Sequence, residues 1–154
     1  MGWGLLLLGA LALLLVSAGI EDVRTREIAN WKNAAIALLA PLWWLSNGVA
    51  LWPDVVLQLT VAAGIFAFFC VAFHFGQMGG GDVKMIGALS LWLPLLPLLT
   101  MLLVMSIVGG VLTVVLMIER HLKRTRGGIE VPYGVAIAIA GLLALREPLL
   151  NQLS

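Results

Sequence analysis

The sequence predicts an all-α, polytopic membrane protein: a helical bundle of about six transmembrane segments. Of its 154 residues, 62% are hydrophobic and only 11% are charged, whereas about 25% of residues in an ordinary soluble domain are charged. Apolar runs long enough to cross a bilayer recur along the whole chain. No polar stretch is long enough for a separate soluble domain, so residues 1–154 are expected to form a single transmembrane domain.

The first half of the chain contains three of these apolar segments. Residues 3–20 are read as a retained transmembrane helix, because no Lys or Arg precedes them and the run is longer than the roughly 7–15 apolar residues of a signal peptide. A polar island at 21–32 follows, with three acidic and three basic residues. The second segment covers 34–45 and reaches back toward Ile28 if it spans the bilayer, and the third covers 55–75.

The second half begins with an uncharged run, residues 85–118. It is too long for one ordinary transmembrane helix and just long enough for two. Because proline disfavours helix at the residue before it, a tight hairpin is expected near Pro94 and Pro97. A second polar island covers 119–130, and the last apolar segment runs over 132–145.

The basic residues support six segments rather than five. With six, the loops at 21–33, 76–84 and 119–130 share one side of the membrane. They then carry eight of the nine basic residues, namely Arg24, Arg26, Lys32, Lys84, Arg120, Lys123, Arg124 and Arg126. The positive-inside rule assigns that side to the cytoplasm and both termini to the opposite side. Asp22 and Asp82 are therefore expected on the same, cytoplasmic, face.

The stretch Met-Gly-Gly-Gly-Asp-Val-Lys at 78–84 is the strongest candidate for a functional site. An ionisable residue such as Asp82 between apolar segments is costly and marks function by default. Gly79–81 would permit φ > 0 and the close approach of another chain. Lys84 either lowers the pKa of a nearby carboxylate or extends to the interface. His74 is a proton carrier by type, with a packing or interfacial role as the alternative.

Asp22 and Asp82 together can form a carboxylate pair. Two close carboxylates cannot both ionise easily, so the pair holds one proton between them. Such a pair can hydrolyse an amide, because one carboxylate takes a proton from water while the acid polarises the carbonyl. The alternative for Asp22 is a solvated charge paired with Arg24 and Arg26. The sequence contains no phosphate loop, no His/Cys metal spacing and no Gly-x-Ser-x-Gly elbow. Its single cysteine, Cys70, is interpreted as a small buried apolar residue.

Three motifs resemble one known family. Gly-Gly-Gly-Asp-Val-Lys at 79–84 is similar to the GxGDxK signature of type IV prepilin leader peptidases, which are GxGD-type membrane aspartic proteases. Asp22 and the residues to Asn30 resemble the other aspartate motif of that family, with Ala29 where a proline is usual. Pro-Tyr-Gly-Val-Ala-Ile, which begins at Pro132, looks like the family's C-terminal segment.

The resemblance implies an aspartic-type endopeptidase in the bacterial inner membrane, with Asp22 and Asp82 catalytic and Gly79, Gly81 and Lys84 supporting. It implies removal of the short basic leader of prepilins or pseudopilins at the cytoplasmic face. Neither a cofactor nor a metal is implied, and the expected partners are the precursor helix and the lipid bilayer, not nucleic acid. The short form resembles peptidases of Flp-type pili, without the N-methyltransferase activity of longer members.

Other readings stay open at this stage. An archaeal preflagellin-type peptidase would share the chemistry and differ in substrate. A small proton-coupled transporter subunit would use Asp82 and Lys84 as a relay, but leaves the Asp22 island unexplained. A membrane scaffold without chemistry does not account for the cost of burying Asp82. The precursor, the oligomeric state and the Asp22–Asp82 distance are not specified by the sequence.

Overall fold

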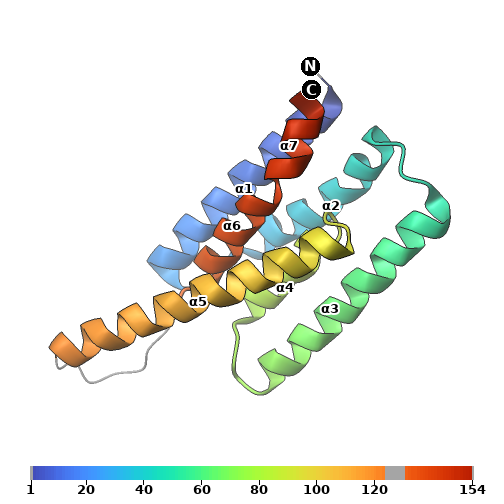
Figure 1. The fold of residues 1–154 in the computed structure, drawn as a ribbon. Coiled ribbons are helices and arrows are strands. Elements are labelled where there is room, and N and C mark those ends of the chain that lie inside the picture. Colours follow the sequence, from blue (N-terminus) through green and yellow to red (C-terminus); the bar gives the residue numbers. More distant parts are fainter. Residues whose placement is uncertain (1, 124–130, 154) are drawn as a thin grey trace.

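The computed structural model describes residues 2–123 and 131–153, and every regular element in those ranges is helical (Figure 1). The order is α1 (Trp3–Thr25), α2 (Asn30–Ser46), one irregular helical turn η1 (Leu51–Val55), α3 (Val56–His74), α4 (Gly80–Leu89), α5 (Leu95–Lys123), α6 (Tyr133–Ala144) and α7 (Arg146–Leu153). The all-α prediction is confirmed.

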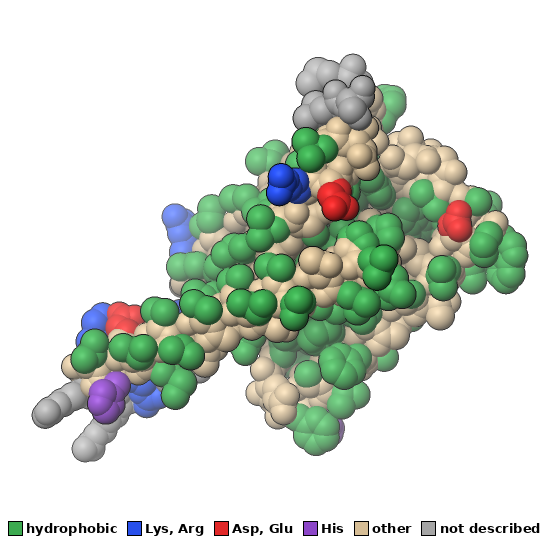
Figure 2. Space-filling model, viewed as in Figure 1, with side chains coloured by type: hydrophobic (Ala, Val, Ile, Leu, Met, Phe, Trp, Pro, Cys, Tyr) green, Lys and Arg blue, Asp and Glu red, His purple; other side chains and the backbone are tan. Residues whose placement is uncertain are grey.

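Four of the helical stretches are long and apolar enough to cross a membrane: Trp3–Thr25, Leu51–His74, Leu95–Lys123 and Tyr133–Gln152. The outer surface is largely apolar as well, with exposed side chains such as Leu13, Leu38, Phe68 and Leu103 on four different helices (Figure 2). A surface of this kind is suited to lipid, because apolar patches of such extent are rare on soluble monomers.

The uncharged run at 85–118 forms two helices, as the charge distribution predicts. The break between them comes at residues 90–94, so Pro97 lies in the first turn of α5 rather than in a hairpin. The expectation of a tight hairpin is wrong, because α5 packs chiefly along α6 and α4 packs against α3, α2 and α6. α4 has only 10 residues, or about 15 Å of helix, and does not cross a bilayer alone.

Side chains from neighbouring helices satisfy the backbone at this break. The Gln58 side-chain Nε2 donates to the carbonyls of Ser90 and Leu93, at 2.6 Å each. Trp44 Nε1 donates to the Leu91 carbonyl at 2.9 Å. Trp92, which lies in the break itself, donates from Nε1 to the carbonyl of Ile36 in α2 at 2.8 Å. Non-helical backbone at membrane depth needs such protein partners, because lipid offers none.

The core forms where α1, α4 and α6 meet. Its fully buried members are Leu8, Leu11, Leu15, Ile36, Met85, Ile86, Leu89, Leu93, Leu98, Met101, Ile137 and Leu145. Figure 1 shows the start of α1 beside the end of α7, and Gln152 Nε2 there donates to Asn47 Oδ1 at 3.0 Å. The end of α1 and the start of α2, α4 and α6 lie at the opposite end. The helix directions therefore agree with both termini lying on one side. Residues 124–130 of the second polar island, with Arg124 and Arg126, fall outside the described ranges.

Candidate active site

The glycine cluster forms the first turn of α4. Gly79 is the N-cap, with φ −71° and ψ 147°, and the glycines with positive φ are Gly48 and Gly76 instead. Gly79–81 would permit φ > 0, but none of the three adopts it. Close approach does explain Gly81, since a Cβ there would lie 3.3 Å from the Cβ of Ile28. Glycine lets the loop before α2 rest directly on the turn that carries Asp82.

Asp22 lies near the C-terminal end of α1 and is buried, with 5% of its surface exposed. Its Oδ2 accepts a hydrogen bond from the backbone N–H of Val135 at 3.2 Å. Val135 belongs to the first turn of α6, where its N–H also donates to the Pro132 carbonyl at 3.1 Å and the helix dipole favours a negative charge. Gly134 makes room for this contact, because a Cβ there would lie 2.8 Å from Asp22 Cγ. Asp22 is thus seated against α6 and is not a solvated loop charge.

Asp82 is the second buried acid, with 8% of its surface exposed. It stands in the first turn of α4, outside the four helical stretches long enough to span a membrane. Burial, and next the negative charge of Asp22, raise the pKa of Asp82 to about 7, against the opposing effect of the Gly79 backbone. α2 and α6 each pack against both α1 and α4. These two helices hold the two acidic side chains near enough to influence each other's charge.

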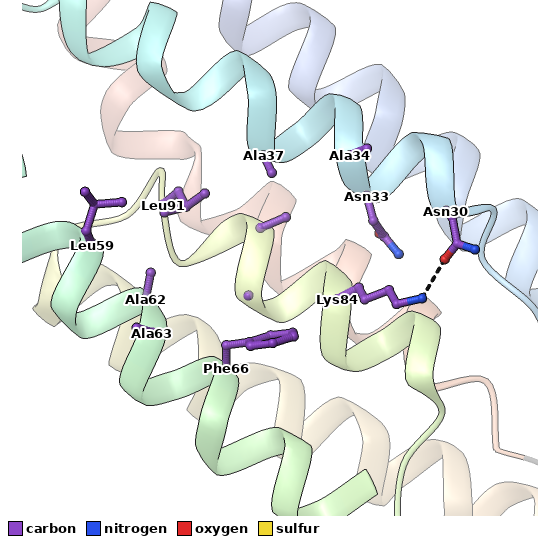
Figure 3. Close-up of a pocket in the computed structure, with 12 residues that line it drawn as sticks. Asn30, Asn33, Ala34, Ala37, Leu59, Ala62, Ala63, Phe66, Lys84 and Leu91 are labelled. Atoms are coloured by element: carbon purple, nitrogen blue, oxygen red, sulfur yellow. Dashed lines mark hydrogen bonds between the residues drawn. The ribbon is translucent and has the colours of Figure 1, made fainter.

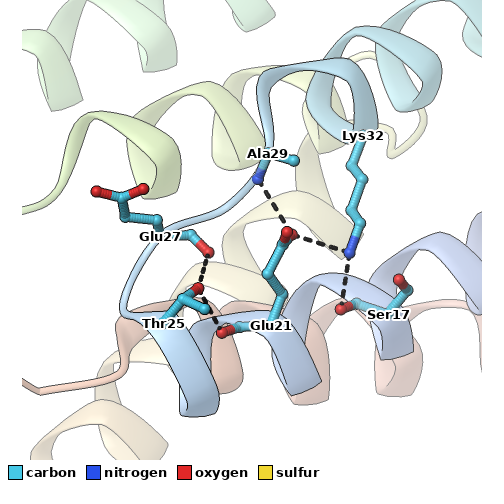
Figure 4. A network of polar contacts seen from close by, with 6 residues as sticks. All are labelled: Ser17, Glu21, Thr25, Glu27, Ala29 and Lys32. Atoms are coloured by element: carbon cyan, nitrogen blue, oxygen red, sulfur yellow. Dashed lines mark hydrogen bonds and ion pairs between the residues drawn. The ribbon is translucent and has the colours of Figure 1, made fainter.

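A polar network fixes the connection between α1 and α2 (Figure 4). Glu21 Oε2 pairs with Lys32 Nζ at 2.9 Å and accepts the backbone N–H of Ala29 at 3.1 Å. Lys32 Nζ also donates to the carbonyl of Ser17 at 3.0 Å. Thr25 Oγ1 closes the turn by donating to the Glu21 carbonyl at 3.0 Å. Because Glu21 is adjacent to Asp22, the network fixes the end of α1 on which that acid stands.

Ala29 takes a backbone conformation in which proline is also comfortable. Its φ of −59° and ψ of 130° match the φ near −65° that a proline ring imposes. Alanine keeps an N–H, however, and that N–H is the donor to Glu21 Oε2. The departure from the proline of the resembling motif therefore preserves the turn and adds one hydrogen bond to the network.

Lys84 does not pair with an acid in the hydrogen bonds and ion pairs of the described residues. Its Nζ donates to Asn30 Oδ1 at 2.8 Å, and the side chain is exposed. Asn33, one turn further along α2, donates from Nδ2 to the Gly81 carbonyl at 3.1 Å. These two asparagines, and the Glu21–Lys32 pair, were missed by the sequence reasoning. The i, i+3 spacing of Asn30 and Asn33, which places both on one helix face, was the available signal.

His74 and Cys70 lie on α3. The His74 ring is exposed at the end of that helix and packs edge-on against Phe75, with ring centroids 5.6 Å apart. Cys70 is half-buried. In the ranges 2–123 and 131–153, no group of three His, Cys, Asp or Glu side chains is placed to hold a metal ion.

Comparison with known proteins identifies the family. The model of the type IV leader peptidase family matches residues 9–114, which include both buried aspartates and the glycine cluster. The chain belongs to the type IV leader peptidase family. A curated relative, the prepilin leader peptidase/N-methyltransferase of Stutzerimonas stutzeri, is 34% identical over an alignment of 125 residues that covers 71% of this chain. The chain spans 40% of the length of that relative. No solved structure matches the chain.

Within a type IV leader peptidase, the observed arrangement is suited to hydrolysis of an amide bond. The pKa of Asp82 is raised to about 7, and Asp22 accepts the backbone N–H of Val135. Acid and base are then available together without a covalent intermediate. Because the two groups interact, the proton belongs to the pair rather than to either residue alone.

Proposed function

We propose that this type IV leader peptidase is an aspartic endopeptidase in which Asp22 and Asp82 form the catalytic pair. The observation that carries the proposal is the burial of two carboxylates from distant parts of the chain at the same end of the bundle. Buried acids that perturb each other are typical of catalytic sites. Neither acid has a base as its partner in the described ion pairs, where Lys32 and Lys123 pair with Glu21 and Glu119.

In the proposed reaction a water molecule lies between the carboxylates and the scissile peptide. The ionised carboxylate takes one proton from the water, and the resulting hydroxide attacks the carbonyl carbon. The protonated Asp82 donates its hydrogen bond, and then its proton, to the carbonyl oxygen. The tetrahedral intermediate collapses with cleavage of the C–N bond: its hydroxyl returns a proton to Asp82 as the C=O bond re-forms, and the departing amine takes the proton that Asp22 received from water. Two products leave, and the pair keeps one proton.

The proposed substrates are prepilins or pseudopilins of the Flp-like kind, which carry a short basic leader before an apolar helix. The family and the name of the relative support prepilins as substrates, and the resemblance of the sequence to the short form implies the Flp-like kind. Basic residues of the chain gather at the end of the bundle where the aspartates lie, which supports a site at the cytoplasmic face of the bacterial inner membrane. We further propose cleavage without methyl transfer, as the resemblance to the peptidases of Flp-type pili implies.

The test is cleavage of purified precursors by the protein in lipid vesicles, with the products measured by mass. Asp22→Asn and Asp82→Asn are each expected to abolish cleavage while the helical content and thermal midpoint stay near the parental values. Asp54→Asn is the matched control, since Asp54 is an exposed acid in η1 and its loss should leave the rate unchanged. Full activity in either site variant would rule out the pair.

The same assay separates the alternatives. A single cut bond gives the site of cleavage, and the mass of the new N-terminus shows whether a methyl group has been added. If the folded parent cleaves no precursor, proton flux across the vesicle membrane becomes the decisive measurement. A flux lost in Asp82→Asn would favour the transporter reading over the peptidase.

A further inference from the structure

A groove opens between α2, α3 and α4, on the side of α4 that faces away from the core (Figure 3). Its volume is about 560 Å³. Most of the lining consists of small or apolar side chains, namely Ala34, Ala37, Leu59, Ala62, Ala63, Phe66, Gly87, Ala88 and Leu91. Walls of alanine and glycine let another helix come close, because helix association in membranes relies on small residues at the contact.

The groove exists because α3 stands apart from the rest of the bundle. α3 packs against α4 and η1, and Ala62 is its only buried residue. Figure 1 shows α3 at one edge of the bundle, joined to α4 by residues 75–79. Phe66 rests on Gly87, where a Cβ would lie 2.6 Å from the Phe66 ring. The gap between α2 and α3 is therefore open sideways, toward the bilayer.

One end of the groove is polar and leads to the catalytic turn. Asn33 lines the groove there, and it holds the carbonyl of Gly81, the residue before Asp82, through its Nδ2. Asn33 is 4% exposed, and its Oδ1 is buried without a hydrogen-bond partner. An unpaired buried acceptor is costly, so this oxygen is suited to a donor that arrives with an occupant.

We propose that the groove receives the apolar helix of the precursor, which enters sideways between α2 and α3. This inference rests on the function proposed above and names where the substrate binds. The first four N–H groups of any helix have no intrahelical partner. With its N-terminus at the Asn33 end, the precursor helix offers such an N–H to Asn33 Oδ1. The chain before that helix then passes the first turn of α4, where Asp82 stands.

The polar end also distinguishes a protein helix from lipid as the occupant. An acyl chain fills an apolar groove but has no donor for Asn33 Oδ1. Lys84, held by Asn30 Oδ1 at 2.8 Å, adds a second polar group at the same end. A helix whose N-terminus and cleavage point are adjacent fits both the apolar walls and the polar end, and an acyl chain fits only the walls.

The experiment is site-directed cross-linking in lipid vesicles. Ala37→Cys and Ala63→Cys are made in a Cys70→Ala, Asp82→Asn background, so that substrate binds without being cut, and the precursor carries one cysteine in its apolar helix. Phe68→Cys is the matched control on α3, because Phe68 is 67% exposed and lies about 140° around the helix from Ala63. We expect enzyme–precursor products from both groove positions and none from Phe68.

The outcomes separate this inference from the function on which it rests. Two results would overturn the docking site and leave the peptidase function intact. The first is cross-linking from Phe68→Cys as strong as that from the groove positions. The second is no cross-linking from the groove positions although the parent with Asp82 cleaves the precursor. Enzyme–enzyme products from Ala37 would show a second copy in the groove and would also overturn it. A parent that cleaves no precursor would remove the proposed function itself.

A second set of variants fills the groove without touching the acids. Ala37→Leu and Ala63→Leu are expected to lower kcat/KM about tenfold or more, mainly through KM, because the added atoms occupy the space of the incoming helix. Gly64→Leu is the control, since no atom lies within 4 Å of a Cβ at Gly64. Unchanged KM in both folded groove variants would contradict the proposal.

Discussion

Gly134 offers the sharpest test of how Asp22 is seated. A Cβ at this position would lie 2.8 Å from Asp22 Cγ and Oδ2 and 2.8 Å from Ile28 Cδ1. To restore an ordinary contact of 3.4 Å, these groups must retreat by about 0.6 Å. Movement by the carboxylate loosens its hydrogen bond to Val135, and movement by Ile28 disturbs the loop that rests on Gly81.

Gly134→Ala is therefore expected to reduce activity more than stability. Overpacking of this kind costs about 1–3 kcal/mol. A displacement of about 1 Å at a catalytic group can cost about 100-fold in rate, so a loss between about 10-fold and 100-fold in kcat is expected here. The assay is precursor cleavage in vesicles, with thermal unfolding followed by circular dichroism on the same preparation.

Gly110→Ala is the control for adding a methyl group to a glycine of this bundle. No atom lies within 4 Å of a Cβ at Gly110, and alanine in a helix interior is favoured over glycine by about 0.8–1 kcal/mol. This variant should therefore keep its activity and unfold at the same temperature or higher. A Gly134→Ala protein that cleaves at the parental rate would refute the role given to the Asp22 seat.

Three further predictions follow from the site and its supports. The pKa of Asp82 is raised to about 7, so the fraction of protonated Asp82 declines as the pH rises. The value of kcat is therefore expected to fall about tenfold per pH unit above neutrality. A kcat that stays constant from pH 6 to 9 would contradict Asp82 as the acid. Trp92→Phe removes the buried N–H bond to α2 and should cost about 1 kcal/mol of unfolding free energy, measured against Trp3→Phe, which alters a side chain that is 78% exposed. Lys32→Met should lower the thermal midpoint, because Glu21 loses its partner. The double variant Lys32→Met, Glu21→Gln should recover part of that loss. Equal midpoints for Lys32→Met and the parent would show that the Glu21–Lys32 pair does not stabilise the fold.

The sequence was most informative about the helices and the two acids. Hydropathy and the distribution of basic residues predicted the helical class and the division of residues 85–118, because both depend on composition along the chain and not on contacts between side chains. The glycine cluster beside Asp82 marked a close contact, and Gly81 does meet Ile28. The residue roles inferred from resemblance remain predictions for the variants above.

The sequence was least informative about contacts between distant segments. Nothing near Asp22 in the chain indicates Val135, which lies 113 residues away. The tight hairpin was wrong because proline patterns describe where a helix breaks but not which helix the next one packs against. Asn33 donates to a backbone carbonyl. Because every residue has such a carbonyl, the sequence does not indicate which one Asn33 contacts. Such partners follow from the packing of whole helices.

The hydrogen bond between Asp22 and Val135 also has a consequence for the timing of biosynthesis. Asp22 leaves the ribosome 113 residues before its partner, an interval of roughly 6–23 s at ordinary translation rates. Until α6 is inserted, one of the two helices that pack against both α1 and α4 is missing, and only α2 connects the helices that carry the two acids. The nascent chain is thus inserted into the membrane before this site is assembled, and under the proposed function it becomes able to cleave a peptide only once the last part of the bundle is in place.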